Sequence, residues 1–473
     1  MESTEFAIAI MAAGKGTRLK SKRPKVLHEI GGRALLLHVI AAARQVVQAK
    51  DIYCIVGHEA DRVRAAVEAT GVQFVLQAEQ RGTGHALQML KAFFALSGSP
   101  VPENLLVLSG DVPLIRPETI ERIRQIHVSE KAAMTILTAV PDNPTGYGRV
   151  LRAQPGTDAP DVLAIVEQKS LTPEQLHTPE INSGIYCFRT PALFDKLDLL
   201  DTNNAHGEYY LTDVAAMLVA DNQRVVAVKG DSVDEVLGAN TIAEMMHLDA
   251  AMRLDTARRL MASGVTVFRP ETTVIDSEVA VGPDTVIEPY VQLLGSTTIG
   301  SDCRIRSYSV IQNSTIGNNV TVRNGCIMDS ATVADSATLG PYAHLRPESR
   351  IGEGAHLGNF VETKKLTMGA GSKANHLNYL GDAVIGAGVN VGAGAITCNY
   401  DGVHKHQTII GDNVFVGSDS TLVAPITIES DSYIAAGSCI TDDVPSGSLA
   451  LGRSRQVTKP GWLAKKRSSK EDS

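Results

Sequence analysis

Aliphatic residues return at every sixth position through much of the second half of the chain. The first register is unbroken and holds Ile275, Val281, Ile287, Leu293, Ile299, Ile305 and Ile311. It resumes at Ile316 and Val322, then at Val333, Leu339, Leu345, Ile351 and Leu357, and finally at Ile410, Val416, Leu422, Ile428, Ile434 and Ile440. A period of six matches neither a helix nor a hairpin, and sandwich strands repeat at roughly 8–12 residues. The pattern therefore predicts a parallel β-helix, in which each short strand points one side chain inward.

The six-residue count fails in two places that are rich in polar residues. The first lies within 358–384 and contains TKKLTMGAGSKANHLNYLGD. The second lies within 392–409 and contains GAGAITCNYDGVHKHQT. Insertions in a solenoid emerge as loops, often on the binding face. We therefore expect two inserted loops, each with a candidate site.

Short β-branched runs alternate with amphipathic segments in the first half of the chain. The expected strands are 7–11, 52–57, 74–77, 105–111 and 134–140, and the expected helices include 35–48 and 84–95. This alternation predicts a Rossmann-like, mainly parallel α/β sheet with sites where loops leave the carboxyl ends of its strands. Residues 241–262 contain no Gly or Pro and predict one linking helix.

Composition and charge narrow the partners. A chain of 473 residues favours two or more domains. Its net charge is −8 with both signs intermixed, which argues against nucleic acid and membrane and favours small molecules. No apolar run reaches the roughly 18 residues that span a bilayer, and acidic residues stand where a secretion signal carries Lys or Arg, so we expect a cytoplasmic protein. The six cysteines form no C-x-x-C pair, which argues against zinc-ribbon and redox motifs.

The loop AAGKGTRL after the first strand is a candidate phosphate site. Gly14 and Gly16 let backbone N–H groups approach phosphate oxygens, while Arg18 and Lys25 add positive charge. The spacing matches neither the dinucleotide fingerprint nor the G-x-x-x-x-G-K-[ST] loop, and a tight turn is the alternative. The strand within 105–111 ends on Asp111, which is either a plain turn residue or a ligand for Mg²⁺ on a triphosphate.

His376 is the candidate base in the first polar segment. An amine must be neutral to attack a thioester, and His has a reference pKa of about 6.5. The alternative is that this single His is structural or solvated. His404 and His406 have H-x-H spacing, but no carboxylate or Cys accompanies them, so we expect solvated loop residues rather than a metal site.

Several motifs carry a family resemblance. The runs AAGKGTRL, PKVLH, LQAEQRGTGHA, SGDVPL, TGYGR, VEQK and INSG resemble sugar-1-phosphate nucleotidyltransferases. With the hexapeptide segment behind them, nearly the whole chain resembles the bacterial bifunctional N-acetylglucosamine-1-phosphate uridyltransferase and glucosamine-1-phosphate acetyltransferase family. The resemblance implies a left-handed β-helix and four parts: a uridyltransferase domain (1–240), a linking helix (241–262), an acetyltransferase domain (263–450) and a basic tail (451–473). We expect the last ten residues to be disordered.

The resemblance also implies the residues of the first site. The uridine nucleotide would lie on Ala12, Ala13, Gly14, Lys25, Gln77, Gly82 and Thr83, with Arg18 on a phosphate. The sugar would be held by Gly148, Glu167 and Asn182. Mg²⁺ would be bound by Asp111 and Asn240, and Asn240 would contact the substrate as well.

The second site is implied in the same way. Arg346 and Lys364 would hold the phosphate of glucosamine-1-phosphate, with the adjacent Lys365 as the alternative. The remaining residues would be His376 as the base, Tyr379 and Asn390 on the sugar, and Ala393, Asn399, Tyr400, Ser418, Ala436 and Arg453 on acetyl-CoA.

The implied activity is the synthesis of UDP-N-acetylglucosamine, a precursor of peptidoglycan and lipopolysaccharide. A homotrimer would acetylate glucosamine-1-phosphate with acetyl-CoA and then transfer uridylyl from UTP to N-acetylglucosamine-1-phosphate. Two alternatives stay open. One is a glucose-1-phosphate nucleotidyltransferase whose β-helix serves assembly and regulation, and the other is a non-enzymatic trimerising scaffold.

Overall fold

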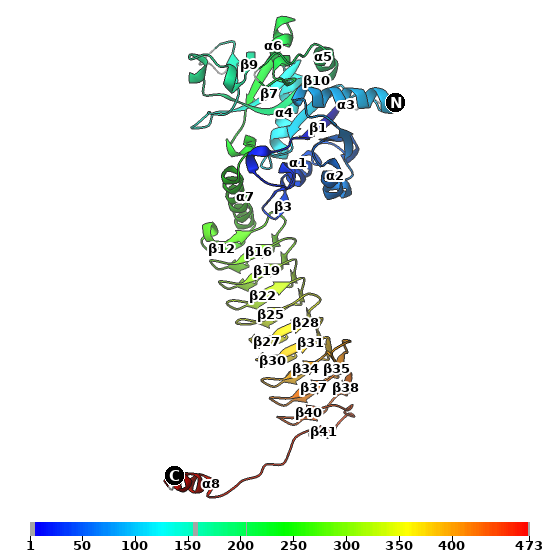
Figure 1. The fold of residues 1–473 in the computed structure, drawn as a ribbon, viewed down its shortest axis with the longest axis vertical. Helices are drawn as coiled ribbons and strands as arrows, with labels where there is room; N and C mark the ends of the chain where they lie inside the picture. Colours follow the sequence, from blue (N-terminus) through cyan, green and yellow to red (C-terminus); the bar gives the residue numbers. More distant parts are fainter. Residues whose placement is uncertain (1–4, 155–158, 205, 472–473) are drawn as a thin grey trace. The chain divides into compact units, whose positions relative to one another are not determined.

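The protein is described by a computed structural model that covers residues 5–154, 159–204 and 206–471 (Figure 1). It divides into two compact units, Met1–Arg253 and Leu254–Ser473, and each is described by itself. The division falls within helix α7 (Ile242–Ala262), which covers nearly the range expected for a linking helix. Among the described residues, no helix combines the length and the apolar character needed to cross a bilayer.

The first unit is built on one mixed sheet with the strand order β11-β7-β10-β6-β1-β4-β5. All five expected strands are present, and β10 runs antiparallel to both of its neighbours in an otherwise parallel arrangement. The bounds are β1 (Phe6–Ala12), β4 (Ile52–Val56), β5 (Gln73–Leu76), β6 (Asn104–Ser109), β7 (Met134–Ala139), β10 (Ile181–Arg189) and β11 (Val225–Lys229).

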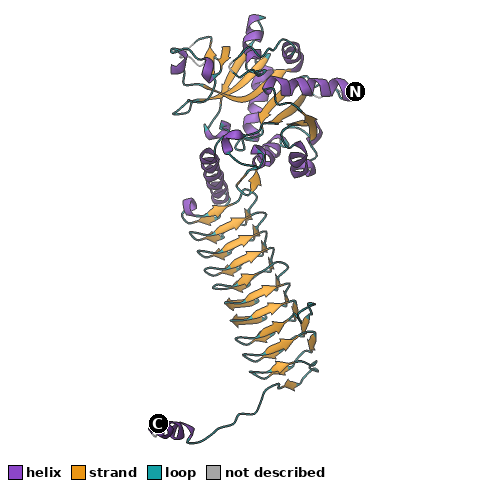
Figure 2. Ribbon diagram, viewed as in Figure 1, coloured by secondary structure: helices purple, strands orange, loops and turns teal. Residues whose placement is uncertain are grey.

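Helices cover both faces of this sheet (Figure 2). In β1, Ile8 and Ile10 belong to one buried cluster, with residues of α1 (Leu35–Ala43), α2 (Ala60–Val67) and α4 (Pro117–Ser129). Ala7 and Ala9 belong to a second cluster, with residues of α3 (Thr83–Ser97), α5 (Thr190–Leu197) and α6 (Asp213–Ala220). The expected helix at 35–48 ends earlier because residues 45–46 form tight turns onto Ala42 and Ala43.

A hairpin made of β8 (Arg149–Arg152) and β9 (Val162–Val166) adjoins β10. The register between β8 and β10 consists of one pair, Arg149 with Ile181. The amino end of β8 and the carboxyl end of β9 therefore meet the sheet near the start of β10.

The second unit is a parallel β-helix with three faces, formed by sheets of eleven, ten and nine short strands. The strands run from β12 (Thr266–Val267) to β41 (Leu449–Ala450), and neighbouring strands within each sheet lie one coil apart. The predicted six-residue register is confirmed, because its aliphatic side chains are buried in one continuous core, with Val281 partly buried.

The prediction of an inserted loop within 358–384 is wrong. Strands β28 (Glu362–Lys364), β29 (Thr367–Met368), β30 (Lys373–His376) and β31 (Tyr379–Gly381) continue the coil there. The aliphatic pattern disappears because Thr363 and Ala374 take inward positions, and the buried Thr363 hydroxyl is hydrogen-bonded to Ser349 Oγ at 2.9 Å. A coil interior thus accepts a paired hydroxyl or a small side chain.

The second expected loop is present. Ile396 in β34 (Ile396–Cys398) pairs with Thr421 in β37 (Thr421–Val423), while residues 399–407 bulge out before β35 (Thr408–Ile410). At the carboxyl end, α8 (Trp462–Glu471) stands where disorder was expected, and residues 472–473 lie outside the described chain.

Candidate active sites

Four polar side chains from distant parts of the first unit converge at the carboxyl end of β1 and β6. Lys25 forms an ion pair with Asp111 Oδ2 and donates to Asn240 Oδ1 at 2.8 Å. Arg18 Nη2 donates to the same Asn240 oxygen at 2.6 Å. The site thus combines two side-chain oxygens that could bind a metal with two cations that could bind phosphate.

The other residues expected around the nucleotide lie at or just after the end of β1, just after β5 and at the start of α3. The buried Gln77 donates through Nε2 to the carbonyl of Gly82 at 3.0 Å, and a Cβ on Gly57 would lie 2.9 Å from both Ala13 Cβ and the Gln77 carbonyl. Ala13 and Gln77 are therefore neighbours. Ala12 ends β1, and Gly14 follows in the loop with open space beside it.

Gly82 and Thr83 are held by a loop that sequence reasoning missed. Gly82 has φ 106°, and a Cβ there would lie 2.6 Å from the carbonyl oxygen of Tyr209, so a larger residue is excluded. Thr83 starts α3 and accepts a hydrogen bond from the N–H of Leu211 at 3.2 Å. No spacing rule connects residues 82–83 with 209–211, so the sequence contained no signal for this contact.

The three residues expected on the sugar lie together where the hairpin meets β10. The N–H of Asn182 donates to the Gly148 carbonyl at 2.9 Å, and a Cβ on Gly148 would lie 3.6 Å from Glu167 Oε2. Burial raises the pKa of Glu167, while the hydroxyl of Thr212, which donates to its Oε1 at 3.2 Å, opposes that shift. A carboxylate, an amide and backbone groups can together form hydrogen bonds with sugar hydroxyls.

In the β-helix, four expected site residues occupy the same place in successive coils. Each of the four lies three positions after a strand residue, and these strand residues pair with one another from coil to coil. The strand residues are Lys373, Asn390, Phe415 and Tyr433, and the site residues are, in the same order, His376, Ala393, Ser418 and Ala436. Backbone hydrogen bonds of 2.7–3.1 Å run along the column, from the N–H of Gly394, Asp419 and Gly437 to the carbonyls of His376, Ala393 and Ser418. Arg453 extends the column, because its Nη1 donates to the Ala436 carbonyl at 2.7 Å.

A basic group lies at a different corner of the same coils. Arg346 and Lys364 follow the paired residues His344 and Glu362, and Arg346 also donates to Glu362 at 2.9 Å. The pKa of Lys364 is lowered, first by the neighbouring Lys405 and more weakly by desolvation and Arg346. Sequence reasoning missed Lys405, although it stands between the two His of the second polar segment.

Lys365 is directed elsewhere, because its ammonium pairs with Glu348 at 3.3 Å. Tyr379 lies beside the basic group, since a Cβ on Gly381, the register partner of Lys364, would lie 2.5 Å from the Tyr379 hydroxyl. Asn390 starts β33 (Asn390–Val391) on another face. The expected acyl-transfer residues of one chain are therefore divided between two corners of the β-helix.

The inserted loop at 399–407 is closed by Asp401. Its carboxylate accepts hydrogen bonds from the N–H of His404 and Val403 and from the His406 ring, and these hold the pKa of Asp401 at about 2. Asn399 Nδ2 donates to Asp382, and the Tyr400 hydroxyl donates to the Gly402 carbonyl at 2.5 Å. The expectation that no carboxylate accompanies the two His was wrong, since Asp401 pairs with His406. Even so, no group of three or more His, Cys, Asp or Glu suited to a metal occurs among the described residues.

Comparisons with known families match both units. Residues 8–171 match the MobA-like NTP transferase domain. Residues 278–313 match the bacterial transferase hexapeptide and residues 407–442 the hexapeptide repeat of succinyl-transferase, in keeping with a left-handed β-helix.

Full-length relatives match as well, and each is named bifunctional protein GlmU. The chain is 62% identical to that of Koribacter versatilis, over 99% of this chain and 98% of the relative. It is 49% identical to that of Solibacter usitatus, over 98% and 97%. It is 44% identical to that of Clostridioides difficile, over 99% of each chain. On these matches and the two sites described above, the chain belongs to the bifunctional protein GlmU family.

Proposed function

We propose that the chain makes UDP-N-acetylglucosamine in two steps. The β-helix transfers acetyl from acetyl-CoA to the amine of glucosamine-1-phosphate, and the first unit transfers uridylyl from UTP to the product with release of pyrophosphate. The observation that carries the proposal is the convergence of Arg18, Lys25, Asp111 and Asn240 on one point. We assign uridylyl transfer to residues 1–240 and acetyl transfer to 263–450, joined by the helix at 241–262 and followed by the tail at 451–473.

Uridylyl transfer depends on positioning and charge. The phosphate oxygen of the sugar is already ionised near neutral pH, so it attacks the α-phosphorus of UTP without a general base while pyrophosphate leaves in line. Arg18 and Lys25 neutralise the phosphate oxygens. The nucleotide is held by Ala12, Ala13, Gly14, Gln77, Gly82 and Thr83, and the sugar by Gly148, Glu167 and Asn182.

Asp111 and Asn240 would hold Mg²⁺. Both present an oxygen to the Lys25 ammonium, so their donors already converge on one cation, and a carboxylate with an amide oxygen suits a hard ion that takes its other ligands from phosphates and water. Bound there, the ion would stabilise negative charge on the triphosphate. Lys25 would then be free to contact phosphate.

Acetyl transfer requires a neutral amine. As the neutral amine of glucosamine-1-phosphate attacks the thioester carbonyl, His376 takes a proton from the attacking nitrogen. The C–S bond then breaks, and the thiolate of CoA leaves and receives that proton from His376. Acetyl-CoA lies along the column of Ala393, Ser418, Ala436 and Arg453, with Asn399 and Tyr400 beside it. Arg346 and Lys364 bind the sugar phosphate, with Tyr379 and Asn390 on the sugar. The Lys365–Glu348 pair favours Lys364 for this role.

We further propose a homotrimer in which neighbouring copies complete each acetyl-transfer site. The split between the His376 column and the basic group supports this. So does an apolar ladder at the turns between the eleven-stranded and ten-stranded sheets, in which Tyr290, Tyr308, Tyr342, Phe360 and Leu377 are each about half exposed or more. Its aromatic rings stack with centroids 5.4 and 5.6 Å apart, and it ends at Leu377 beside His376. Apolar stripes of this kind mark contact surfaces.

Two activity assays test the proposed reactions, and light scattering tests the proposed trimer. Glucosamine-1-phosphate with acetyl-CoA should release free thiol, and N-acetylglucosamine-1-phosphate with UTP should release pyrophosphate. If no thiol is released, the result would favour the alternative in which the β-helix serves assembly and regulation. If neither product forms, it would favour the non-enzymatic scaffold. Light scattering should give three copies per particle, and a monomer with full acetyl transfer would overturn the shared site.

A further inference from the structure

The sugar subsite is carried by two parts of the fold that share few backbone contacts. Gly148 directly precedes β8 and Glu167 directly follows β9, so both lie on the hairpin, whereas Asn182 lies on β10. The strands β8 and β10 share one register pair. Side chains must therefore contribute to the placement of the hairpin against β10.

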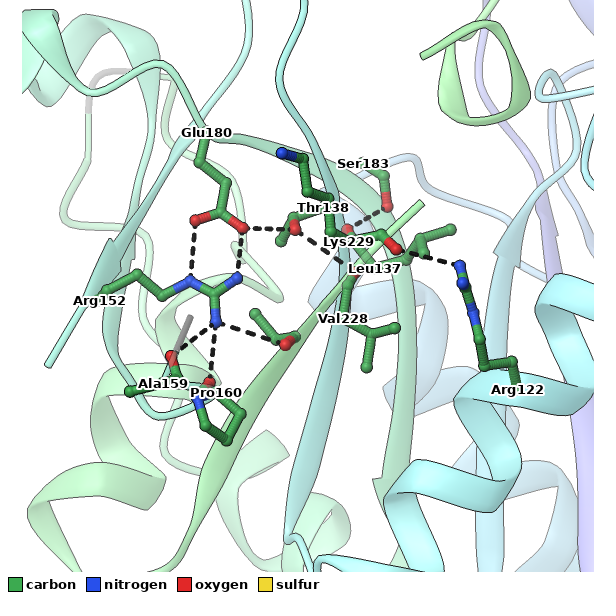
Figure 3. Close-up of polar contacts among 11 residues, drawn as sticks. Arg122, Leu137, Thr138, Arg152, Ala159, Pro160, Glu180, Ser183, Val228 and Lys229 are labelled. Atoms are coloured by element: carbon green, nitrogen blue, oxygen red, sulfur yellow. Dashed lines mark hydrogen bonds and ion pairs between the residues drawn. The ribbon is translucent and has the colours of Figure 1, made fainter. Parts of the chain in front are cut away.

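Arg152, the last residue of β8, is the centre of such a contact (Figure 3). Its Nε donates to Glu180 Oε2 at 2.8 Å and its Nη2 to Glu180 Oε1 at 2.5 Å. Its Nη1 lies 3.1–3.4 Å from the carbonyls of Ala159, Pro160 and Ala227. The same guanidinium thus binds the start of β10, the loop between β8 and β9, and β11.

Glu180 is held from its other side as well. The hydroxyl of Thr138 on β7 donates to Glu180 Oε1 at 2.5 Å. The side chains of Arg152 and Glu180 are only 16% and 14% exposed, so the two-pronged pair is shielded from water and fixed in direction. Glu180 stands two residues before Asn182, and Arg152 stands at the far end of the short strand that begins after Gly148.

A second arginine anchors the other end of the same strand. Arg149 is buried, and it donates through Nε to the Thr178 carbonyl at 2.9 Å and through Nη1 to the Tyr147 carbonyl. Both ends of β8 are therefore tied by arginine side chains to residues 178–180. Two such ties restrict rotation of the hairpin as well as its separation from β10.

We propose that Arg152 and Glu180 are positioning residues for the sugar phosphate. By fixing β8 to the start of β10, they keep Gly148, Glu167 and Asn182 at the separation that one sugar ring requires. In this role, Arg152 and Glu180 act through those three residues. The inference rests on the proposed function of this subsite.

The test compares Arg152→Lys and Glu180→Gln with wild type in the full-length protein. Lys keeps the charge but loses the two-pronged geometry, and Gln keeps the shape but loses the charge. We expect each change to raise the KM for N-acetylglucosamine-1-phosphate on the order of tenfold, because small misplacements of binding groups are costly. The KM for UTP and the rate of acetyl transfer should stay within about twofold of wild type.

Arg122→Lys is the matched control. Arg122 donates to Asp231 at 2.6 Å and, from α4, to the Lys229 carbonyl on β11 at 3.0 Å (Figure 3). Neither of these hydrogen bonds involves the hairpin. The same loss of guanidinium geometry should therefore leave both KM values unchanged. Thermal unfolding of all three variants shows whether the first unit remains folded.

The outcomes are distinct. An unchanged KM for the sugar phosphate in folded Arg152→Lys and Glu180→Gln would overturn the positioning role. So would equal increases in the KM of both substrates, or loss of folding in both variants, since these indicate general support of the unit. If wild type itself forms no pyrophosphate from the two substrates, the proposed function fails instead.

Discussion

The ammonium group of Lys25 is ion-paired with the carboxylate of Asp111, and both side chains are largely withdrawn from solvent. The same ammonium also donates to Asn240 Oδ1 at 2.8 Å. The Lys25 ammonium thus contacts both of the side-chain oxygens that are proposed to bind Mg²⁺. Nucleotide and metal binding should therefore be coupled to movement of Lys25 from these oxygens toward phosphate.

Replacing Asp111 should strongly reduce uridylyl transfer while sparing acetyl transfer. Asp111→Asn keeps the shape of the side chain but removes the charge that pairs with Lys25 and would bind the metal. We expect pyrophosphate release to fall by on the order of 10²-fold or more, in line with the loss of one preorganised electrostatic group. Thiol release should be unchanged. Loss of both activities in folded protein would show that the two sites are not independent.

Replacing His376 should have the opposite effect. His376→Ala removes the proposed base and should lower thiol release from acetyl-CoA by on the order of 10²-fold, with pyrophosphate release intact. His404→Ala is the control, because His404 is an exposed imidazole in the inserted loop with no assigned role. Full thiol release by His376→Ala at neutral pH would exclude His376 as the base.

The raised pKa of Glu167 predicts a pH dependence of sugar binding. Burial favours the protonated form, so as pH falls below neutrality Glu167 loses its charge earlier than an ordinary glutamate and accepts hydrogen bonds less well. The KM for N-acetylglucosamine-1-phosphate should therefore rise on acidification before the KM for UTP does. Glu167→Gln should have a raised KM that no longer responds to pH in this range.

The same shift has a defined sign for stability. The folded-state pKa of Glu167 lies above its unfolded value, so its contribution to the free energy of unfolding is full below the unfolded pKa and is lost as pH rises through the folded pKa. The difference in thermal midpoint between wild type and Glu167→Gln should follow this trend. A difference that does not vary with pH would contradict the assignment.

The inserted loop should depend on Asp401. Asp401→Ala removes the acceptor for the N–H groups of Val403 and His404 and for the His406 ring, so the loop that carries Tyr400 loses its closure. We expect the KM for acetyl-CoA to rise by about 5- to 20-fold, with little effect on glucosamine-1-phosphate or on pyrophosphate release. Asp302→Ala, which removes an exposed carboxylate from a turn of the β-helix that carries no proposed site residue, provides a comparison. Equal effects of the two changes would argue against a specific role for the loop.

The sequence by itself determined the two architectures. Repeats such as Ile299, Ile305 and Ile311 specify the β-helix because each hexapeptide buries its own aliphatic side chain against its neighbours. The strands of the first unit were likewise predictable, since their apolar runs are local. Where Thr363 and Ala374 replaced the aliphatic residue, the same reasoning predicted a loop that does not exist, because a hydroxyl paired inside the coil looks polar in the sequence.

Only the tertiary structure decided how distant residues meet. Arg18 and Asn240 are 222 positions apart, and the sheet edge and the approach to α7 bring them within 2.6 Å. The alignment of His376 with Ser418 depends on the inserted loop being extruded from the coil, which restores the register beyond it. Local patterns specify elements because their physics is local, whereas these contacts depend on how many residues each coil and crossover contains, a property of the packed chain.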